Sequence, residues 1–293
     1  MSHILTLIAD PATAPLERGV VAEVTRMAGG RERWLAPGEA CEWPIAGEDA
    51  APLAARVRAL IVGLPVDLAL TPAAERLKRL LISDMDSTVI TVECIDELAD
   101  VLGLKAPVAE VTRRAMNGEL DFVSALRERV ALLAGLPATT LEEVYRERVR
   151  FMPGARTLVQ TMQARGAVTA LVSGGFAPFV ERVAAELGFA ITQANRLEVE
   201  AGRLTGRVLE PVHDALSKLA LLEDLTARHR LRREQTLAVG DGANDLPMLR
   251  AAGLGVAFRA HPRVTAGAEV AVRYGDLTAL LYLQGIPKAA FAP

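Results

Sequence analysis

The sequence has little cysteine, and this shortage excludes several kinds of protein. Its 293 residues include only two cysteines, Cys41 and Cys94. Two cysteines this far apart form neither a disulfide framework nor a zinc site built on cysteine pairs. Proteins kept in a reducing compartment need no disulfides, so we expect a cytoplasmic protein.

The sequence also lacks an excess of positive charge and a long hydrophobic run. Lysine and arginine total 33 against 36 acidic residues, a net charge of -3, so no basic field favours nucleic acid or an anionic membrane as a partner. The most apolar segment, residues 59–70, is too short to cross a bilayer and contains Pro65 and Asp67. The N-terminus lacks the basic region and longer apolar core of a secretory signal. We therefore expect a soluble protein that binds neither nucleic acid nor membrane.

Lysine is scarce among the basic residues. Only four of the 33 are lysines, namely Lys78, Lys105, Lys218 and Lys288. In a chain so biased towards arginine, a lysine can mark a position where a compact charge fits and a planar guanidinium does not.

The first 72 residues follow a strand and helix order typical of a small α+β domain. The pattern predicts strand 4–8, helix 15–27, extended pieces around Trp34 and Trp43, helix 51–61 and strand 66–70. This order is that of the ferredoxin-like fold. We predict that residues 1–72 form a regulatory or dimerisation domain, and that residues 73–79 form a charged, possibly helical linker.

Residues 77–293 predict a second, larger domain. Residues 80–83 form an apolar strand, and residues 91–151 form a helical cap inserted after it. Strands and helices alternate in the remainder, which indicates a Rossmann-like, doubly wound parallel sheet covered on both faces. The predicted strands are 167–172, 236–239, 254–257 and 270–272, the helices are 178–187, 215–226, 246–252 and 277–283, and residues 196–208 form a hairpin.

Three predicted strands lead into polar clusters, DMDST at 84–88, SGG at 173–175 and GDGAND at 240–245. Each cluster alone has an ordinary explanation as a turn or a solvated loop, and a lysine near a helix start is usually exposed. Their occurrence in order, each after an apolar strand, favours a catalytic site instead. The carboxyl ends of parallel strands share one edge of the sheet, so we expect the clusters to meet there.

The residue types in these clusters suit phosphoryl transfer. Gathered aspartates repel one another unless a cation is present, and oxygen ligands favour Mg²⁺. Ser173, Gly174 and the helix that follows them can bind phosphate, as can Lys218. Asp84 can attack phosphorus, while Asp86 protonates the leaving alkoxide and later activates water.

With these motifs in view, the chain resembles the haloacid dehalogenase-like phosphatases, and within them the enzymes that hydrolyse phosphoserine. The resemblance covers about residues 77–283. It rests on DMDSTVITVECIDE (84–97), RRAMNGELDFVSALRERV (113–130), LVSGGF (171–176), NRLEVEAGRLTG (195–206) and VGDGANDLPML (239–249). It implies a haloacid dehalogenase-like core with a helical cap, a Mg²⁺ cofactor and an aspartyl-phosphate intermediate.

The resemblance also implies a role for each residue of the core site. Asp84 is the expected nucleophile and Asp86 the general acid and base. The carboxylate of Asp84, the backbone carbonyl of Asp86 and Asp241 are the expected metal ligands. The expected phosphate-binding residues are Ser173, Gly174, Lys218 and Asn244, and Asp245 is expected to orient Lys218.

In the cap, the resemblance assigns Glu93 to the substrate ammonium and Arg129 to its carboxylate. Met116, Gly118 and Phe122 are expected to shape the closed pocket. Taken singly, Glu93 could be a charge at a helix start, Arg129 a surface cation, and the two apolar residues ordinary core.

The resulting expectation is a Mg²⁺-dependent phosphatase that converts O-phospho-L-serine to L-serine and phosphate in serine biosynthesis, with a homodimer possible through residues 1–72. The alternatives are a phosphotransferase, a phosphatase for another small phosphomonoester, or a non-catalytic amino-acid sensor.

Overall fold

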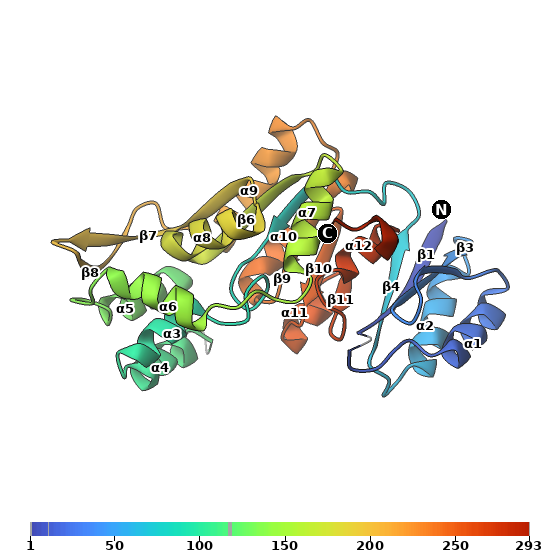
Figure 1. Cartoon of the computed structure of the whole chain (residues 1–293), viewed down its shortest axis with the longest axis horizontal. Coiled ribbons are helices and arrows are strands. Elements are labelled where there is room, and N and C mark those ends of the chain that lie inside the picture. The colour runs from blue at the N-terminus through green and yellow to red at the C-terminus, as the bar shows by residue number, and fades with distance from the viewer. Residues whose placement is uncertain (1, 11, 117–118, 293) are drawn as a thin grey trace.

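The computed structural model describes residues 2–10, 12–116 and 119–292. The molecule is elongated, with the N-terminal unit at one end, a helical cap at the other and a large sheet between them (Figure 1). Within the described ranges, no helix is both long and apolar enough to cross a membrane.

The N-terminal unit is a four-stranded antiparallel sheet covered by two helices. Its strands lie in the order β2-β3-β1-β4, which confirms the predicted ferredoxin-like arrangement. Trp43 is fully buried between sheet and helices, and its indole N–H donates to the Thr25 hydroxyl at 3.0 Å. The elements are β1 (His3–Ala9), α1 (Arg18–Ala28), β2 (Arg33–Ala36), β3 (Ala40–Ile45), α2 (Ala50–Leu60) and β4 (Val66–Pro72).

The linker of residues 73–79 is irregular, so the suggestion that it is helical was wrong. Its polar groups bond to distant partners and not along a helix. The Arg76 guanidinium donates to the buried Glu42 carboxylate at 2.7 Å and to the carbonyl oxygen of Leu283 at 3.2 Å. The backbone N–H of Lys78 donates to the Gln284 side chain at 2.9 Å. These bonds attach the linker to strand β3 of the N-terminal unit and to residues near the end of the chain.

The large sheet has the strand order β11-β10-β9-β5-β6-β7-β8. Its neighbours run parallel except for β8, which pairs antiparallel with β7 at the edge and forms the predicted hairpin. Strand β5 lies between β6 and β9, so the ends of these three strands are adjacent. The strands are β5 (Leu80–Ser83), β6 (Val168–Phe176), β7 (Ile191–Glu200), β8 (Arg203–Leu209), β9 (Thr236–Gly240), β10 (Leu254–Phe258) and β11 (Val270–Val272).

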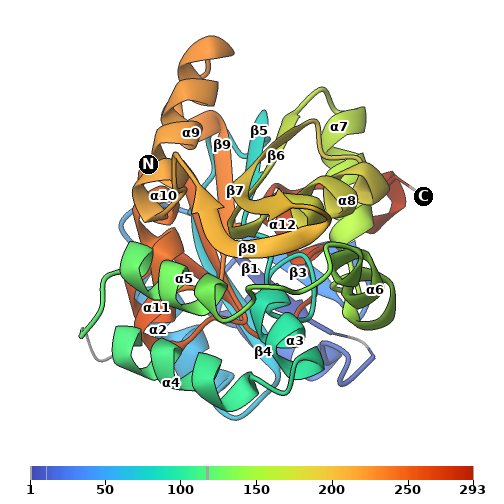
Figure 2. The ribbon, with the colours of Figure 1, turned by 90° about the vertical axis from the view of Figure 1, so that its left-hand side faces the viewer.

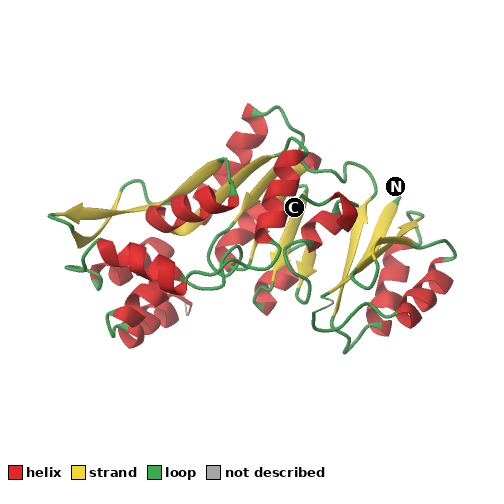
Figure 3. Ribbon diagram, viewed as in Figure 1, coloured by secondary structure: helices red, strands yellow, loops and turns green. Residues whose placement is uncertain are grey.

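Helices cover both faces of this sheet (Figure 3), as predicted for a doubly wound fold. On one face, α7 (Ala155–Ala164), α8 (Ala177–Leu187) and α12 (Ala279–Leu283) pack around Leu81 and Leu171. On the other face, α9 (Ala215–Arg228), α10 (Leu246–Ala251) and α11 (Pro262–Gly267) pack around Leu80 and Ile82. The sequence interpretation did not include α7 and α11. The remaining turns are 3₁₀ segments: η1 (Arg233–Gln235), η2 (Ala243–Asp245) and η3 (Lys288–Ala290).

The inserted cap consists of α3 (Cys94–Val101), α4 (Lys105–Met116), α5 (Phe122–Ala131) and α6 (Thr139–Arg148). Figure 2 shows these helices beside the β7–β8 hairpin, in front of one end of the large sheet. The two connections to the core are tied together, since Thr91 N–H donates to Arg150 at 3.0 Å and Met152 N–H donates to Val89 at 2.8 Å. These two connections form a paired hinge, and the cap has a second attachment at the β7–β8 hairpin, where Gly135 N–H donates to the Leu204 carbonyl at 2.8 Å.

Candidate active site

The first aspartate pair follows β5 directly. Asp84 stays in register beside β9, because its backbone N–H donates to Val239 at 3.0 Å. The chain then turns at Ser87, whose φ of 55° is left-handed. Asp84 is almost fully buried, while Asp86 keeps partial solvent access. The two acids thus have different surroundings, as a division of chemical roles requires.

Lys218 is buried among the aspartates, 2% exposed, and not on the surface as a lysine near a helix start usually is. Its position follows from the start of α9, where Asp214 and Ser217 form a capping box. Its ammonium donates to Asp84 and, at 2.7 Å, to Asp245. Burial disfavours the charge, but the two carboxylates outweigh burial and raise the pKa of Lys218. The lysine therefore stays charged.

Replacing Lys218 with methionine should lower the free energy of unfolding by about 3–5 kcal/mol at neutral pH, because buried Asp84 and Asp245 would lose their cation. The loss should shrink as the pH falls and Asp84 becomes protonated. Lys288→Met is the matched control, since it breaks an ion pair with Glu39 whose lysine is exposed, and such a pair should contribute no more than about 1 kcal/mol. Denaturant unfolding of the metal-free protein measures both. An equal loss of unfolding free energy in the two variants would show that the buried pairs contribute no more to stability than the pair with Glu39.

The loop after β9 carries the other two aspartates. Gly242 N–H donates to Asp245 Oδ2 at 3.0 Å, and a Cβ atom on Gly240 would lie 2.4 Å from the Asp245 carboxyl group. A side chain at residue 240 would therefore displace Asp245. Asp241 accepts a hydrogen bond from the Thr88 hydroxyl at 3.1 Å. Burial, followed by the charge of Asp245, raises the pKa of Asp241 to about 6 and that of Asp84 well above its usual range.

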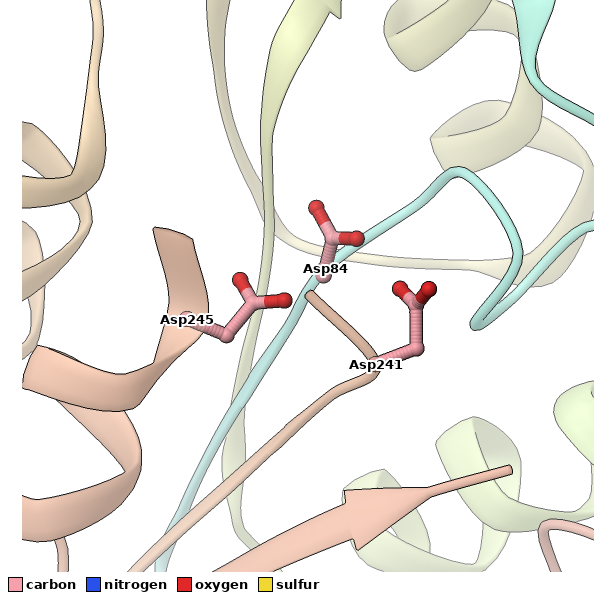
Figure 4. Close-up of side chains that lie close together, drawn as sticks. All are labelled: Asp84, Asp241 and Asp245. Carbon is pink, nitrogen blue, oxygen red and sulfur yellow. The ribbon is translucent and has the colours of Figure 1, made fainter. Parts of the chain in front are cut away.

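The three aspartates could hold a metal ion. Asp84, Asp241 and Asp245 come from two adjacent strand ends, and one oxygen of each lies within 4.8 Å of the others (Figure 4). A single lysine leaves this group with excess negative charge, which a cation would neutralise, and carboxylate oxygens suit a hard divalent ion. Both Asp245 oxygens already accept hydrogen bonds, from Lys218 and Gly242. The carboxylates of Asp84 and Asp241 are therefore the freer ligands.

Asp86 contacts the serine and glycine segment of β6. Its Oδ2 accepts from the Ser173 hydroxyl at 3.0 Å, and its Oδ1 accepts from the Cys94 backbone N–H at 2.9 Å. A Cβ atom on Gly175 would lie 2.9 Å from Asp86 Oδ2, so glycine is required for this approach. Residues 173–175 lie inside β6 and not after it, at a point where its pairing with β7 is interrupted.

The cap brings an acid and a base towards this edge. Glu93 Oε1 accepts from the Ser87 hydroxyl at 2.6 Å. The residue is exposed, but partial desolvation of its carboxyl group by neighbouring atoms, followed by the charge of Asp86, raises the pKa of Glu93 to about 7. Arg129 is partly buried, and this burial lowers its pKa. The negative charges of Asp96 and Glu93 oppose this shift. Among the described residues, Arg129 forms no ion pair; its Nε donates weakly to the Ala125 carbonyl at 3.3 Å.

The remaining expected residues are distributed as follows. Phe122 lies over the core loop, because a Cβ atom on Gly174 would be 2.9 Å from its ring. Asn244 lies in η2 with its Oδ1 against Gly242, and no described residue forms a hydrogen bond with its side chain. Gly118 lies outside the described residues, and so does the side chain of Met116, whose backbone ends α4.

Two residues of the site, Thr88 and Asn195, were not predicted from the sequence. Thr88 is fully buried and holds Asp241, and Asn195 is fully buried beneath Gly174. Both belong to motifs already recognised, DMDST and NRLEVEAGRLTG. Their polar side chains inside otherwise buried stretches were the available signal.

Acidic strand ends, a serine loop and a buried lysine at one edge of a parallel sheet define a class of phosphoryl-transfer proteins, and comparison identifies the family. The family model of the haloacid dehalogenase-like hydrolases matches residues 81–250. The chain belongs to this family, and within it to the group that contains the phosphoserine phosphatases. Its enzyme class is accordingly that of the phosphoric monoester hydrolases.

Individual relatives agree with this placement. A phosphoserine phosphatase of Streptomyces coelicolor is 41% identical over 97% of this chain and 71% of its own length. A probable phosphoserine phosphatase of Vibrio cholerae, solved without ligand, has a TM-score of 0.79 and 34% identity over 99% of this chain and 88% of its own. A phosphoserine phosphatase solved as an analogue of a phospho-aspartyl intermediate has a TM-score of 0.65 and 38% identity over 70% of this chain and 98% of its own.

Proposed function

We propose that this chain is a Mg²⁺-dependent phosphatase of the cytoplasm that hydrolyses O-phospho-L-serine to L-serine and phosphate, as the last step of serine biosynthesis. One observation carries the proposal. Two aspartates in different environments, Asp84 and Asp86, lie beside a buried lysine and a serine loop, while Glu93 and Arg129 add opposite charges from the cap. Phosphoserine offers a phosphate to the first group, and an ammonium and a carboxylate to the second.

The reaction would proceed in two steps. Ser173, the backbone of Gly174 and Lys218 bind the phosphate group, and an oxygen of Asp84 attacks phosphorus. The bond from phosphorus to the serine oxygen breaks, and Asp86 protonates that oxygen. Asp86 then takes a proton from a water molecule that attacks phosphorus, and the bond from phosphorus to Asp84 breaks, which releases phosphate and restores Asp84.

The metal would be held by the carboxylates of Asp84 and Asp241 and by the backbone carbonyl of Asp86. When bound, Mg²⁺ would supply positive charge to the transferring phosphoryl group. Thr88 and Asp245 support this arrangement from behind, since Thr88 donates to Asp241 and Asp245 holds Lys218. Asn244, with no described hydrogen-bond partner, is free to contact the phosphate.

Selectivity should depend on Arg129. Arg129→Ala should lower kcat/KM for phosphoserine by about 10- to 100-fold, because a charge-assisted bond to the substrate carboxylate is lost. An aryl phosphate has no such carboxylate and should be hydrolysed almost normally. Arg127→Ala, on the same helix, is the matched control, because its side chain is exposed and pairs with Glu210. Loss of both activities to the same extent in Arg129→Ala would make Arg129 structural.

A substrate panel tests the function as a whole. The full chain should release phosphate from phosphoserine far faster than from sugar phosphates or phosphothreonine in Mg²⁺, and chelation should stop the reaction. Preferred hydrolysis of another phosphomonoester would change the substrate, and transfer to added alcohols would identify a phosphotransferase. A chain inert towards every phosphomonoester would instead be a sensor.

We further propose that residues 1–72 form a regulatory or dimerisation domain. The support is its firm attachment: buried Asp67 accepts backbone hydrogen bonds from Arg273, Tyr274 and Gly275 at 2.8, 3.0 and 2.9 Å. The same loop continues to Leu277, whose N–H donates to Pro153 at the cap hinge at 3.1 Å. A ligand or a second copy at this domain could therefore influence the cap. A monomeric chain whose activity ignores free amino acids would reject both roles.

A further inference from the structure

Asn195 lies in the large sheet, next to a break in the pairing of β6 with β7. It lies in β7 opposite Phe176, directly after the interruption in pairing between β6 and β7 that spans residues 173–175. Regular ladder hydrogen bonds are missing at this point, although the backbone here carries the proposed phosphate-binding loop. The Asn195 side chain is fully buried beside this break.

The Asn195 carboxamide connects two segments of the site. Its Nδ2 donates to the Gly174 carbonyl at 2.8 Å and to the His213 carbonyl at 3.0 Å, and its Oδ1 accepts from the His213 backbone N–H at 2.7 Å. Both amide hydrogens and one acceptor position are therefore used. A buried amide bonded this completely has a single orientation.

The hydrogen bond from Asn195 to Gly174 connects to Asp86, the proposed general acid. The Gly174 carbonyl and the Gly175 N–H belong to one planar peptide group, so fixing one fixes the other. Gly175 N–H donates to the Ser173 hydroxyl oxygen at 2.8 Å, and that hydroxyl donates to Asp86 at 3.0 Å. The direction of the Ser173 hydroxyl therefore depends, through one peptide plane, on Asn195.

The hydrogen bonds from Asn195 to His213 connect to the helix that carries Lys218. His213 immediately precedes Asp214, the N-cap of α9, and Lys218 lies in the first turns of that helix. Fixing both backbone groups of His213 fixes where α9 begins. The same side chain therefore sets the spacing between the serine loop and the buried ammonium.

We infer that Asn195 is a positioning residue that holds the serine loop and the start of α9 at the spacing required for phosphate, before the substrate arrives; the inference rests on the proposed function of this site. Its carboxamide bonds to the backbone of Gly174 and His213, so it acts on the site through these two residues and not by contact with the reacting atoms. Its effect is preorganisation, because groups fixed in advance need no rearrangement when substrate binds.

Two variants separate this role from packing. Asn195→Ala removes all three hydrogen bonds and leaves a gap, whereas Asn195→Leu fills the space without bonding. In the Mg²⁺-loaded full chain, both should lower kcat for phosphoserine by about 100-fold. Both should also raise the inhibition constant of inorganic phosphate by about tenfold, which corresponds to the loss of one hydrogen bond's worth of binding.

Gln193→Ala is the matched control. Gln193 lies two residues earlier in β7. Its Nε2 contacts the His213 side chain at 2.9 Å and, weakly, the Ser217 carbonyl in the first turn of α9 at 3.5 Å, but it bonds to neither the His213 backbone nor Gly174. This variant should change both kinetic quantities less than twofold. Thermal unfolding, measured alongside, should show all three variants folded at the assay temperature.

Native phosphate inhibition and native kcat in folded Asn195→Leu would overturn the inference, as would equal losses in Gln193→Ala. Phosphate binding measured by calorimetry keeps this test separate from the proposed function. If the native chain failed to hydrolyse phosphoserine, the proposed function would fall, while weaker phosphate binding in the Asn195 variants would still support the positioning role.

Discussion

Asp84→Asn should abolish phosphoserine hydrolysis, with kcat reduced by at least about 10⁴-fold, because the amide cannot become esterified to phosphorus. The same substitution should leave the unfolding midpoint of the metal-free protein at pH 7 equal to or above that of the native chain. The pKa of Asp84 is raised in the folded state by burial and by the charge of Asp245. Its ionised form therefore costs stability above its unfolded pKa, and a neutral amide removes that cost.

This pairing of lost activity with retained stability distinguishes a nucleophile from a structural acid. Lys218 keeps Asp245 as a partner in the variant, so the buried lysine is not left unpaired. Mass spectrometry must show that the asparagine has not deamidated to aspartate. Phosphate release at the native rate by a variant that still carries asparagine at residue 84 would rule out the proposed mechanism.

Asp86→Asn should slow the formation of the aspartyl-phosphate from phosphoserine by about 10²- to 10⁴-fold, the usual contribution of a general acid. An aryl phosphate has a good leaving group that needs no proton, so it should still phosphorylate Asp84 quickly. Water would then attack slowly without its base. Rapid mixing should therefore show a burst of aryl alcohol equivalent to the enzyme, followed by slow turnover.

The substitution is close to isosteric, since the amide oxygen can still accept from Cys94 N–H and the amide nitrogen faces the Ser173 hydroxyl. Binding of inorganic phosphate should therefore change little. Equal slowing of phosphoserine and the aryl ester in the first step would remove Asp86 as the acid. Absence of the burst would remove it as the base.

Much of the fold could be predicted because its signals are local. Strand β5 and the DMDST turn are adjacent in sequence, and apolar runs followed by glycine and aspartate mark strand ends without any tertiary information. The strand order of the N-terminal unit follows from its βαββαβ pattern. Helices α7 and α11 were not predicted. The linker was wrongly predicted to be helical, because its conformation depends on Glu42 and Leu283, which are far away in the chain.

The sequence by itself determined the chemical groups available: the two aspartates after β5, the serine and glycine segment, a rare lysine and the GDGAND loop. Only the tertiary structure decided which of them bond. Lys218 and Asp84 are 134 positions apart and meet because α9 packs beside β5. Likewise, Asn195 gains its partners only where β6 and β7 lose their regular pairing. The physical reason is that a buried polar group must bond to whatever neighbours the strand order supplies, and strand order is not a local property of the chain.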